Sequence, residues 1–161
     1  MSKFIFFYGH NSENGYPSNF YPCKFTIRGI EYSSSEQYMM QQKALIFGDL
    51  EIADQILATT DCKAIKRLGR KVSNYNDYLW SAFRQVIVTE GLIAKFSQNE
   101  DLKQKLLATG TACLVEASPT DRIWGIGMSA KTPGVESISN WRGTNLLGFS
   151  LMYVRDFLLH H

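Results

Sequence analysis

Histidine is nearly absent from this chain of 161 residues: His10 stands in a polar loop, and His160 and His161 are the last two residues. A Ser-His-Asp or Cys-His catalytic group would depend on His10 alone, and no G-x-S-x-G motif is present. The sequence also lacks H-E-x-x-H and any closely spaced group of cysteine and histidine, so no metal site is expected. Because G-x-G-x-x-G and Walker motifs are missing, neither a Rossmann nor a P-loop fold is expected.

Cysteine and long apolar runs are also scarce. Cys23, Cys62 and Cys113 are far apart and odd in number, which argues against a disulfide framework and fits a reducing cytoplasm. The apolar run after Lys3 has only five residues, fewer than a signal peptide needs, and no later run reaches membrane-spanning length. With 17 basic and 15 acidic residues, the chain has no charge excess that would favour nucleic acid or an anionic membrane. We predict a cytoplasmic protein.

What the sequence does contain suits a globular domain. The chain has 161 residues, 45% of them apolar, which is enough to bury one core. We expect a single domain over residues 1–158, and we interpret 159–161 as the start of an expression tag or a disordered tail. No internal repeat or low-complexity tract divides the chain.

The apolar periodicity changes from alternation to helical spacing and back along the chain. Alternation predicts strands over 3–8 and 111–118, a hairpin within 21–32 that turns at Arg28-Gly29, and a late strand over 122–129 bent by its glycines. Helical spacing, with Asp61, Asp77 and Asn145 as caps, predicts helices over 35–48, 49–59, 61–69, 77–96, 99–110 and 145–159. The expected fold class is therefore α+β, mainly α-helical, with a small β-sheet.

The stretch YSSSEQYMMQQK, residues 32–43, places one acid at the expected start of a helix. Ser33 and Glu36 fit the capping-box pattern, in which both side chains satisfy backbone N–H groups of the first turn. Glu36, Met40 and Lys43 also follow each other at i, i+4 and i+7, so an acid and a base share one stripe of the helix. Taken alone, the pattern favours a cap and a solvated lysine over a catalytic pair.

Two tryptophans are candidates for ligand contact. Trp80 on the longest predicted helix and Trp124 in IWGIG are bulky planar groups, which serve as core residues more often than as stacking platforms. Gly125 and Gly127 beside Trp124 would let a ligand come close to backbone N–H groups. The local pattern makes Asp121, just ahead of them, a turn cap first.

The segment NWRGTN leads into the last predicted helix. Gly143 and Asn145 stand at its start, where free N–H groups and the positive end of the helix dipole suit an anion. Arg70, Lys71 and Arg142 would add charge for a phosphate, although exposed basic side chains usually only solvate a surface. Every helix start has this property, so a plain helix start is the competing interpretation.

Together these segments resemble one family, the YbiA-like N-glycosidases, also named the NADAR family. The resemblance covers about residues 4–157 and rests on the order and spacing of short blocks. The blocks are SNFYPCKF (18–25), Gly29 with YSSSEQYMMQQK (29–43), LGR (68–70), Trp80, AKF (94–96), LLATG (106–110), LVEAS (114–118), DRIWGIG (121–127) and WRGTNLLGFSLMYVR (141–155).

The resemblance implies a compact, mainly helical α+β domain that hydrolyses C1–N glycosidic bonds in phosphoribosylated or ADP-ribosylated compounds. Activities of the family include cleavage of early aminopyrimidine intermediates of riboflavin biosynthesis to ribose 5-phosphate and a free pyrimidine. Other members remove ADP-ribose from guanine bases. The resemblance implies no metal or redox cofactor.

The resemblance also implies roles for residues at matching positions. Glu36 would be the catalytic carboxylate, and Asp121 would be its partner or an acceptor for a ribose hydroxyl. The tryptophans would wall the base, while basic side chains and the N–H groups of 143–145 would hold phosphate. Some bacterial members carry an acid where this chain has Ile126, so no acid or base operates there. The substrate-binding candidates are Asn19, Phe20, Lys43, Arg70, Trp80, Trp124, Gly125, Gly127, Gly143 and Asn145.

Three activities stay open. The first is a small-metabolite N-glycosidase, the second an ADP-ribosyl hydrolase acting on guanine nucleotides or DNA, and the third a non-catalytic module that binds ADP-ribose or NAD derivatives. Near-neutral charge disfavours long nucleic acids, and the intact Glu36 and Asp121 blocks disfavour a pure binder. We expect a phosphoribosyl or ADP-ribosyl small molecule as substrate, nucleic acid only as an ADP-ribosylated substrate, and no membrane partner.

Overall fold

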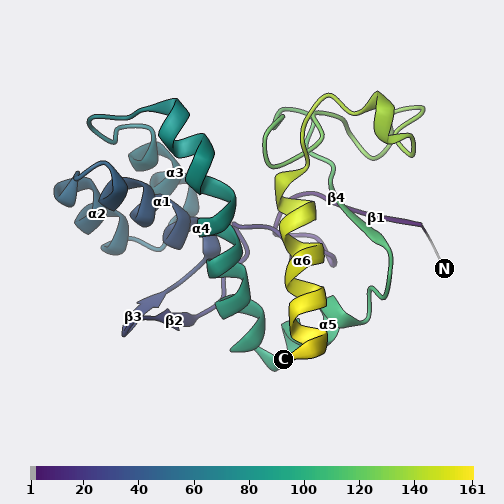
Figure 1. Ribbon diagram of the computed structural model, residues 1–161, viewed down its shortest axis with the longest axis horizontal. Helices are drawn as coiled ribbons and strands as arrows, with labels where there is room; N and C mark the ends of the chain where they lie inside the picture. Colours follow the sequence, from purple (N-terminus) through teal and green to yellow (C-terminus); the bar gives the residue numbers. More distant parts are fainter. Residues whose placement is uncertain (1–2) are drawn as a thin grey trace. The chain divides into compact units, whose positions relative to one another are not determined.

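The computed structural model describes residues 3–161 and groups them into two compact units (Figure 1). Unit 1 combines the described residues up to Tyr21 with Glu100–His161, and unit 2 is Pro22–Asn99. Within residues 3–161, six α-helices outweigh four short strands, which confirms the predicted mainly helical α+β class. The single domain expected over 1–158 remains a prediction.

Unit 1 is built on a parallel strand pair. β1 (Phe4–Phe7) pairs with β4 (Cys113–Glu116), with Phe4 opposite Cys113 and Phe7 opposite Glu116. β1 and β4 confirm the two strands that the alternating pattern predicts over 3–8 and 111–118. The helices of the unit are α5 (Glu100–Leu107), the short 3₁₀ helix η1 (Ile138–Asn140) and α6 (Leu146–His160), and α6 packs against both β4 and α5 (Figure 1).

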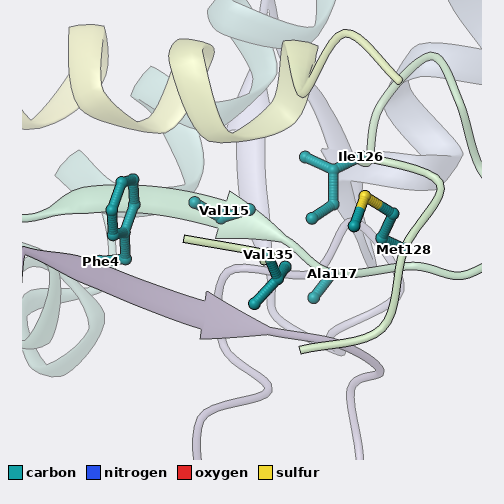
Figure 2. Packing of buried hydrophobic residues seen from close by; sticks show 6 residues of the cluster. All are labelled: Phe4, Val115, Ala117, Ile126, Met128 and Val135. Atoms are coloured by element: carbon teal, nitrogen blue, oxygen red, sulfur yellow. The ribbon is translucent and has the colours of Figure 1, made fainter. Parts of the chain in front are cut away.

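The core of unit 1 includes a cluster of six buried side chains around β4. Figure 2 shows Val115 on the strand and Ile126, Met128 and Val135 on the chain that follows it. Trp141 packs against this cluster, and its indole N–H donates to the Val135 carbonyl at 2.8 Å. The loop from residue 118 to 145 is therefore anchored by apolar burial at three points along its length. The cluster consists of Phe4, Val115, Ala117, Ile126, Met128 and Val135.

Two expectations for unit 1 need correction. Residues 122–129 form turns and bends instead of a second late strand. The Gly127 N–H donates to the Asp121 carbonyl at 3.0 Å, and Gly127 has φ +65°, outside the strand region. At the other end, α6 continues through His160, so residues 159 and 160 are helical and do not form a disordered tail.

Unit 2 begins with the predicted hairpin. β2 (Phe25–Ile27) pairs antiparallel with β3 (Ile30–Tyr32), and the two central turn residues, Arg28 and Gly29, have φ of 49° and 80°. Positive φ at both positions is typical of the tight turns whose twist matches paired strands. The four strands of the described residues form two separate two-stranded sheets, whereas the sequence predicted one small sheet.

Four helices complete unit 2: α1 (Ser35–Ile46), α2 (Leu50–Leu57), α3 (Cys62–Gly69) and α4 (Asp77–Ser97). α1 lies at the centre and packs against the other three (Figure 1). Asp61 caps α3 as predicted, by accepting from the Lys63 N–H. The cap of α4 is Asn76, whose side chain accepts from the Leu79 N–H, so the predicted cap Asp77 is instead the first helical residue.

Candidate active site

The start of α1 is capped by a pair one residue later than the pair predicted. The Ser34 hydroxyl accepts a hydrogen bond from the Gln37 N–H at 3.1 Å. The Gln37 side-chain oxygen turns back to accept from the Ser33 N–H at 2.8 Å and from the Ser33 hydroxyl at 3.0 Å. The capping box expected for Ser33 and Glu36 is therefore wrong. Glu36 is buried in the first turn, with 5% of its surface exposed.

Lys43, two turns along α1 from Glu36, is enclosed by aromatic rings. Its ammonium nitrogen lies 4.6 Å from the ring centroid of Tyr75 and 5.7 Å from that of Trp80. The same nitrogen donates to the carbonyl of Gly69, at the end of α3, at 2.8 Å. Half-buried and held by a carbonyl, Lys43 is not the solvated surface lysine that the pattern alone favoured.

The charges around Lys43 come from three elements. Burial is the main influence and lowers the pKa of Lys43 below its usual value. Glu36 on α1 and Asp77 at the start of α4 raise that pKa, while Arg70, which follows α3, lowers it further. Unit 2 thus brings together all four of its predicted site residues, which are Glu36, Lys43, Arg70 and Trp80.

Tyr75 belongs to this group, although no sequence pattern had indicated it. Its ring packs edge-on against Phe47, with centroids 5.4 Å apart, and its hydroxyl donates to Asp77 at 2.7 Å. Burial, followed by the hydrogen bond to Asp77, raises the pKa of Tyr75 to about 12. Tyr75 lies in the irregular segment before α4, where periodicity carries no information about orientation.

Lys95, near the end of α4, is a second buried or half-buried lysine, and it was not among the predicted site residues. Its side chain is 0% exposed, and burial lowers its pKa to about 8, while the nearby Cys23 and Cys62 thiols raise it. Lys95 shares the inward stripe of the helix with Val88 and Leu92, which are 1% and 0% exposed. A lysine on an apolar stripe is the signal that would have found it.

In unit 1, Asp121 organises the turn that carries Trp124. One carboxylate oxygen, Oδ1, accepts from the Ile123 N–H at 2.9 Å and from the Trp124 N–H at 2.8 Å. This is the turn-cap role that the local pattern favoured. Gly125 fits against the carbonyls of Glu116 and Asp121, which an added Cβ would approach to 2.9 and 3.0 Å.

The start of α6 differs from the anion site that was expected. The N–H groups of residues 144 to 147 donate to the carbonyls of residues 122, 125, 123 and 124 in that order, at 2.9 to 3.1 Å. These donors are already used, and a phosphate would have to displace a carbonyl to reach them. Gly143 permits the close approach, because a Cβ there would lie 2.4 Å from the Gly125 carbonyl oxygen.

Asn145 precedes α6 in the left-handed region, at φ 51°, but its side chain makes no cap bond. Instead, the fully buried amide bridges to β4: Oδ1 accepts from the Glu116 N–H, and Nδ2 donates to the Leu114 carbonyl, both at 3.0 Å. Asn145 thus holds the loop, β4 and α6 together.

The remaining predicted residues of unit 1 lie in the loop after β1. Asn19 is buried, with 6% exposed, and Phe20 is half-buried, with its ring centroid 5.9 Å from that of His10. The Phe20 N–H donates to the Ser18 hydroxyl at 3.1 Å. The predicted residues therefore fall into one group in unit 2, centred on Glu36 and Lys43, and further groups in unit 1, at this loop and at the turn from Asp121 to Asn145. All the assigned roles remain predictions.

Two further properties concern the part of the chain from residue 3 onward. No helix in it is both long and apolar enough to cross a membrane. No group of three or more His, Cys, Asp or Glu side chains is positioned there to hold a metal ion.

Comparison with known proteins gives a consistent result. The model of the NADAR domain matches residues 6–159. An N-glycosidase of Acanthamoeba polyphaga mimivirus is 43% identical over 162 residues, covering 96% of this chain and 95% of the relative. A riboflavin biosynthesis protein of Vibrio vulnificus is 34% identical, covering 100% of this chain but only 40% of the relative. The NMR structure of the E. coli protein YbiA matches with a TM-score of 0.82 at 29% identity, covering 99% of this chain and 88% of the other.

The fold and these relatives define a hydrolase of N-glycosidic bonds. The chain belongs to the NADAR domain family.

Proposed function

We propose that this N-glycosidase cleaves phosphoribosylated aminopyrimidines of riboflavin biosynthesis to ribose 5-phosphate and free base. The observation that carries the proposal is the cluster in unit 2, where a buried carboxylate shares a helix stripe with a lysine whose ammonium lies over two aromatic rings. The riboflavin biosynthesis protein of Vibrio vulnificus supports the substrate class, although this chain spans less than half of that protein.

Glu36 is the residue proposed to act on water. Hydrolysis at C1 passes through an oxocarbenium-like state, which needs a carboxylate to take a proton from water and to stabilise positive charge. Because the Ser34–Gln37 pair caps α1, the Glu36 carboxylate is not needed for that task. Its position in the first helical turn places the carboxylate at the positive end of the helix dipole.

Binding is assigned to the groups around Glu36. Trp80 on α4 is the candidate for contact with a planar base, and Arg70, exposed after α3, is the candidate for the phosphate. Fixing a phosphate away from C1 would orient the sugar for reaction. Unit 1 holds a separate candidate group, in which the Trp124 indole would contact a base and the Oδ2 of Asp121, which the turn does not use, would accept from a ribose hydroxyl.

The test is a product screen. The protein is incubated separately with an aminopyrimidine ribotide, an ADP-ribosylated guanine nucleotide and NAD, and mass spectrometry follows released base, ribose 5-phosphate and ADP-ribose. We expect the ribotide to give free pyrimidine and ribose 5-phosphate at the highest kcat/KM. Faster release of guanine would replace this proposal with the ADP-ribosyl hydrolase, and thermal stabilisation without any product would support a binding module. The cytoplasmic location inferred from the cysteines belongs to the same proposal.

A further inference from the structure

We propose that Lys43 is the general acid that protonates the departing nitrogen when the glycosidic bond breaks. This assignment rests on the proposed role of Glu36 as the carboxylate that activates water. It also reassigns Lys43 from phosphate binding to the reaction itself.

The first argument is the position of the ammonium group. The nitrogen of Lys43 is held by the Gly69 carbonyl at 2.8 Å and lies 5.7 Å from the ring centroid of Trp80. The ammonium lies over the face of the indole, so a base that contacts Trp80 also lies beside the Lys43 N–H groups. An ammonium has three donors, and Gly69 takes one of them.

The second argument is the spacing from Glu36. Seven residues of helix separate the two Cα atoms by about 10 Å along the axis, with both side chains on one stripe. Glycosidases in which an acid and a base act on opposite sides of the bond likewise hold the two groups apart, so that a water fits beside the sugar carbon. An acid and a base are thus presented by one rigid element.

The third argument is the local charge. The groups that face Lys43 are Glu36 on its own helix, Arg70 after α3, and Asp77 and Tyr75 at the start of α4. Burial outweighs the two carboxylates and lowers the pKa of Lys43, which makes its ammonium a better proton donor than an exposed lysine. Arg70 is exposed and its planar guanidinium can pair two phosphate oxygens at once, so it suits a phosphate better than Lys43 does.

The step balances as follows. The C1–N bond breaks with its electron pair on nitrogen, and that nitrogen takes a proton from the Lys43 ammonium. Glu36 takes a proton from water, and the resulting hydroxide oxygen bonds to C1. The proton on Glu36 then returns through solvent to the neutral Lys43 amine. The net reaction is glycoside plus water to sugar plus free base.

The test uses leaving groups that differ in their need for a proton. An aminopyrimidine departs as an amine and needs protonation, whereas nicotinamide departs neutral from nicotinamide mononucleotide without it. We expect Lys43→Met to lower kcat on the aminopyrimidine ribotide by at least about a hundredfold. On nicotinamide mononucleotide it should lower kcat by only a few-fold. Lys63→Met, which removes an exposed lysine of α3, is the matched control and should change neither rate.

Several outcomes overturn the assignment. Equal losses on both substrates would mean that Lys43 binds and does not donate a proton. A borohydride-stable sugar adduct on Lys43 would mean that its amine attacks C1 itself. If the wild type leaves the mononucleotide intact, the pH profile decides: wild-type kcat on the ribotide should fall at alkaline pH, and Lys43→Met should lack that fall.

The proposed aminopyrimidine substrate can be wrong while the acid role of Lys43 is right, and the two cases can be told apart. If the wild type cleaves no ribotide, the same comparison is made with ADP-ribosylated guanine, which departs as an amine, and NAD, which releases neutral nicotinamide. A selective loss with Lys43→Met in that pair would keep the acid assignment and discard the aminopyrimidine substrate.

Discussion

The Ser34 hydroxyl accepts the Gln37 N–H at 3.1 Å, and this hydrogen bond closes the first turn of α1. The Gln37 side chain, in turn, reaches back to Ser33 and forward to the end of α2, where its amide donates to the carbonyls of Ile56 and Thr59 at 3.1 and 2.9 Å. The Ser34–Gln37 pair is therefore the cap of this helix. A cap variant and a Glu36 variant can be compared at the same turn.

Glu36→Gln should abolish most turnover and leave the fold intact. Loss of a positioned base typically costs a hundredfold to ten-thousandfold, so we expect kcat on the best substrate to fall by at least about a hundredfold. Because glutamine has nearly the same shape and the Ser34–Gln37 cap is retained, the variant should stay folded with one cooperative unfolding transition. Steady-state kinetics and urea denaturation check the two halves of this prediction.

Ser34→Ala is the matched control for Glu36→Gln. Removing the cap should cost about 1 kcal/mol of stability and much less activity than Glu36→Gln. An unfolded Glu36→Gln protein whose refolded fraction stays active would show that the carboxylate is structural.

Asn145→Ala should destabilise the protein more than Asn145→Gly. Both variants lose the bridge to Glu116 and Leu114, and each buried backbone group left without its partner costs about 1–3 kcal/mol. Alanine carries an extra cost of about 1–2 kcal/mol at φ 51°, which glycine avoids. Chemical denaturation of the two variants measures the difference. Equal stabilities would mean that the left-handed backbone relaxes in the alanine variant.

Gly148→Ala should be far more damaging than Gly69→Ala. An added Cβ at residue 148 would lie 2.1 Å from the Leu114 carbonyl oxygen, which belongs to β4 and cannot move alone. At residue 69 the nearest atom, also at 2.1 Å, is the sulfur of Met40, at the flexible end of a side chain. We expect a cost of about 3 kcal/mol or more for the first variant and about 1 kcal/mol or less for the second. Thermal melts that rank the variants in the opposite order would contradict this view of the α6–β4 contact.

At alkaline pH, the free energy of unfolding of the wild type should rise relative to that of the Lys95→Met variant. Burial lowers the pKa of Lys95 from 10.5 to about 8 in the folded protein. Below pH 8 both states carry the proton, and the folded protein bears the full cost of the buried charge. Between pH 8 and 10.5 only the unfolded state keeps the proton, so the wild type should gain up to about 3 kcal/mol over the variant.

The measurement for Lys95 is the free energy of unfolding at several values from pH 7 to pH 11. The difference between wild type and Lys63→Met, an exposed position, should stay constant over this range. Parallel profiles for wild type and Lys95→Met would mean that Lys95 titrates like a solvated lysine.

Local chemistry was enough to predict much of the fold. The helix over 35–48, the Asp61 cap and the Arg28-Gly29 turn each depend on residues close together in the chain, so the sequence identifies them. The late strand over 122–129 failed for the opposite reason. Alternation predicts a strand only where a partner strand takes the hydrogen bonds along its length. Here Asp121 accepts from the N–H groups of residues 123, 124 and 127, and the Ile126 N–H donates to β4, at the Glu116 carbonyl.

The sequence by itself determined that a helix starts within YSSSEQ and that an acid and a lysine share its stripe, because helix periodicity is a local property. It did not determine which residue caps that helix, since Ser33–Glu36 and Ser34–Gln37 fit the same motif. The tertiary structure selects Gln37 as the capping partner, because its side-chain amide also donates to the carbonyls of Ile56 and Thr59 at the end of α2. A carboxylate has no N–H group and could not make these two hydrogen bonds. Gln37 therefore takes part in the cap in place of Glu36. The rings of Tyr75 and Trp80, which come from a distant segment of the chain, lie beside the Lys43 ammonium.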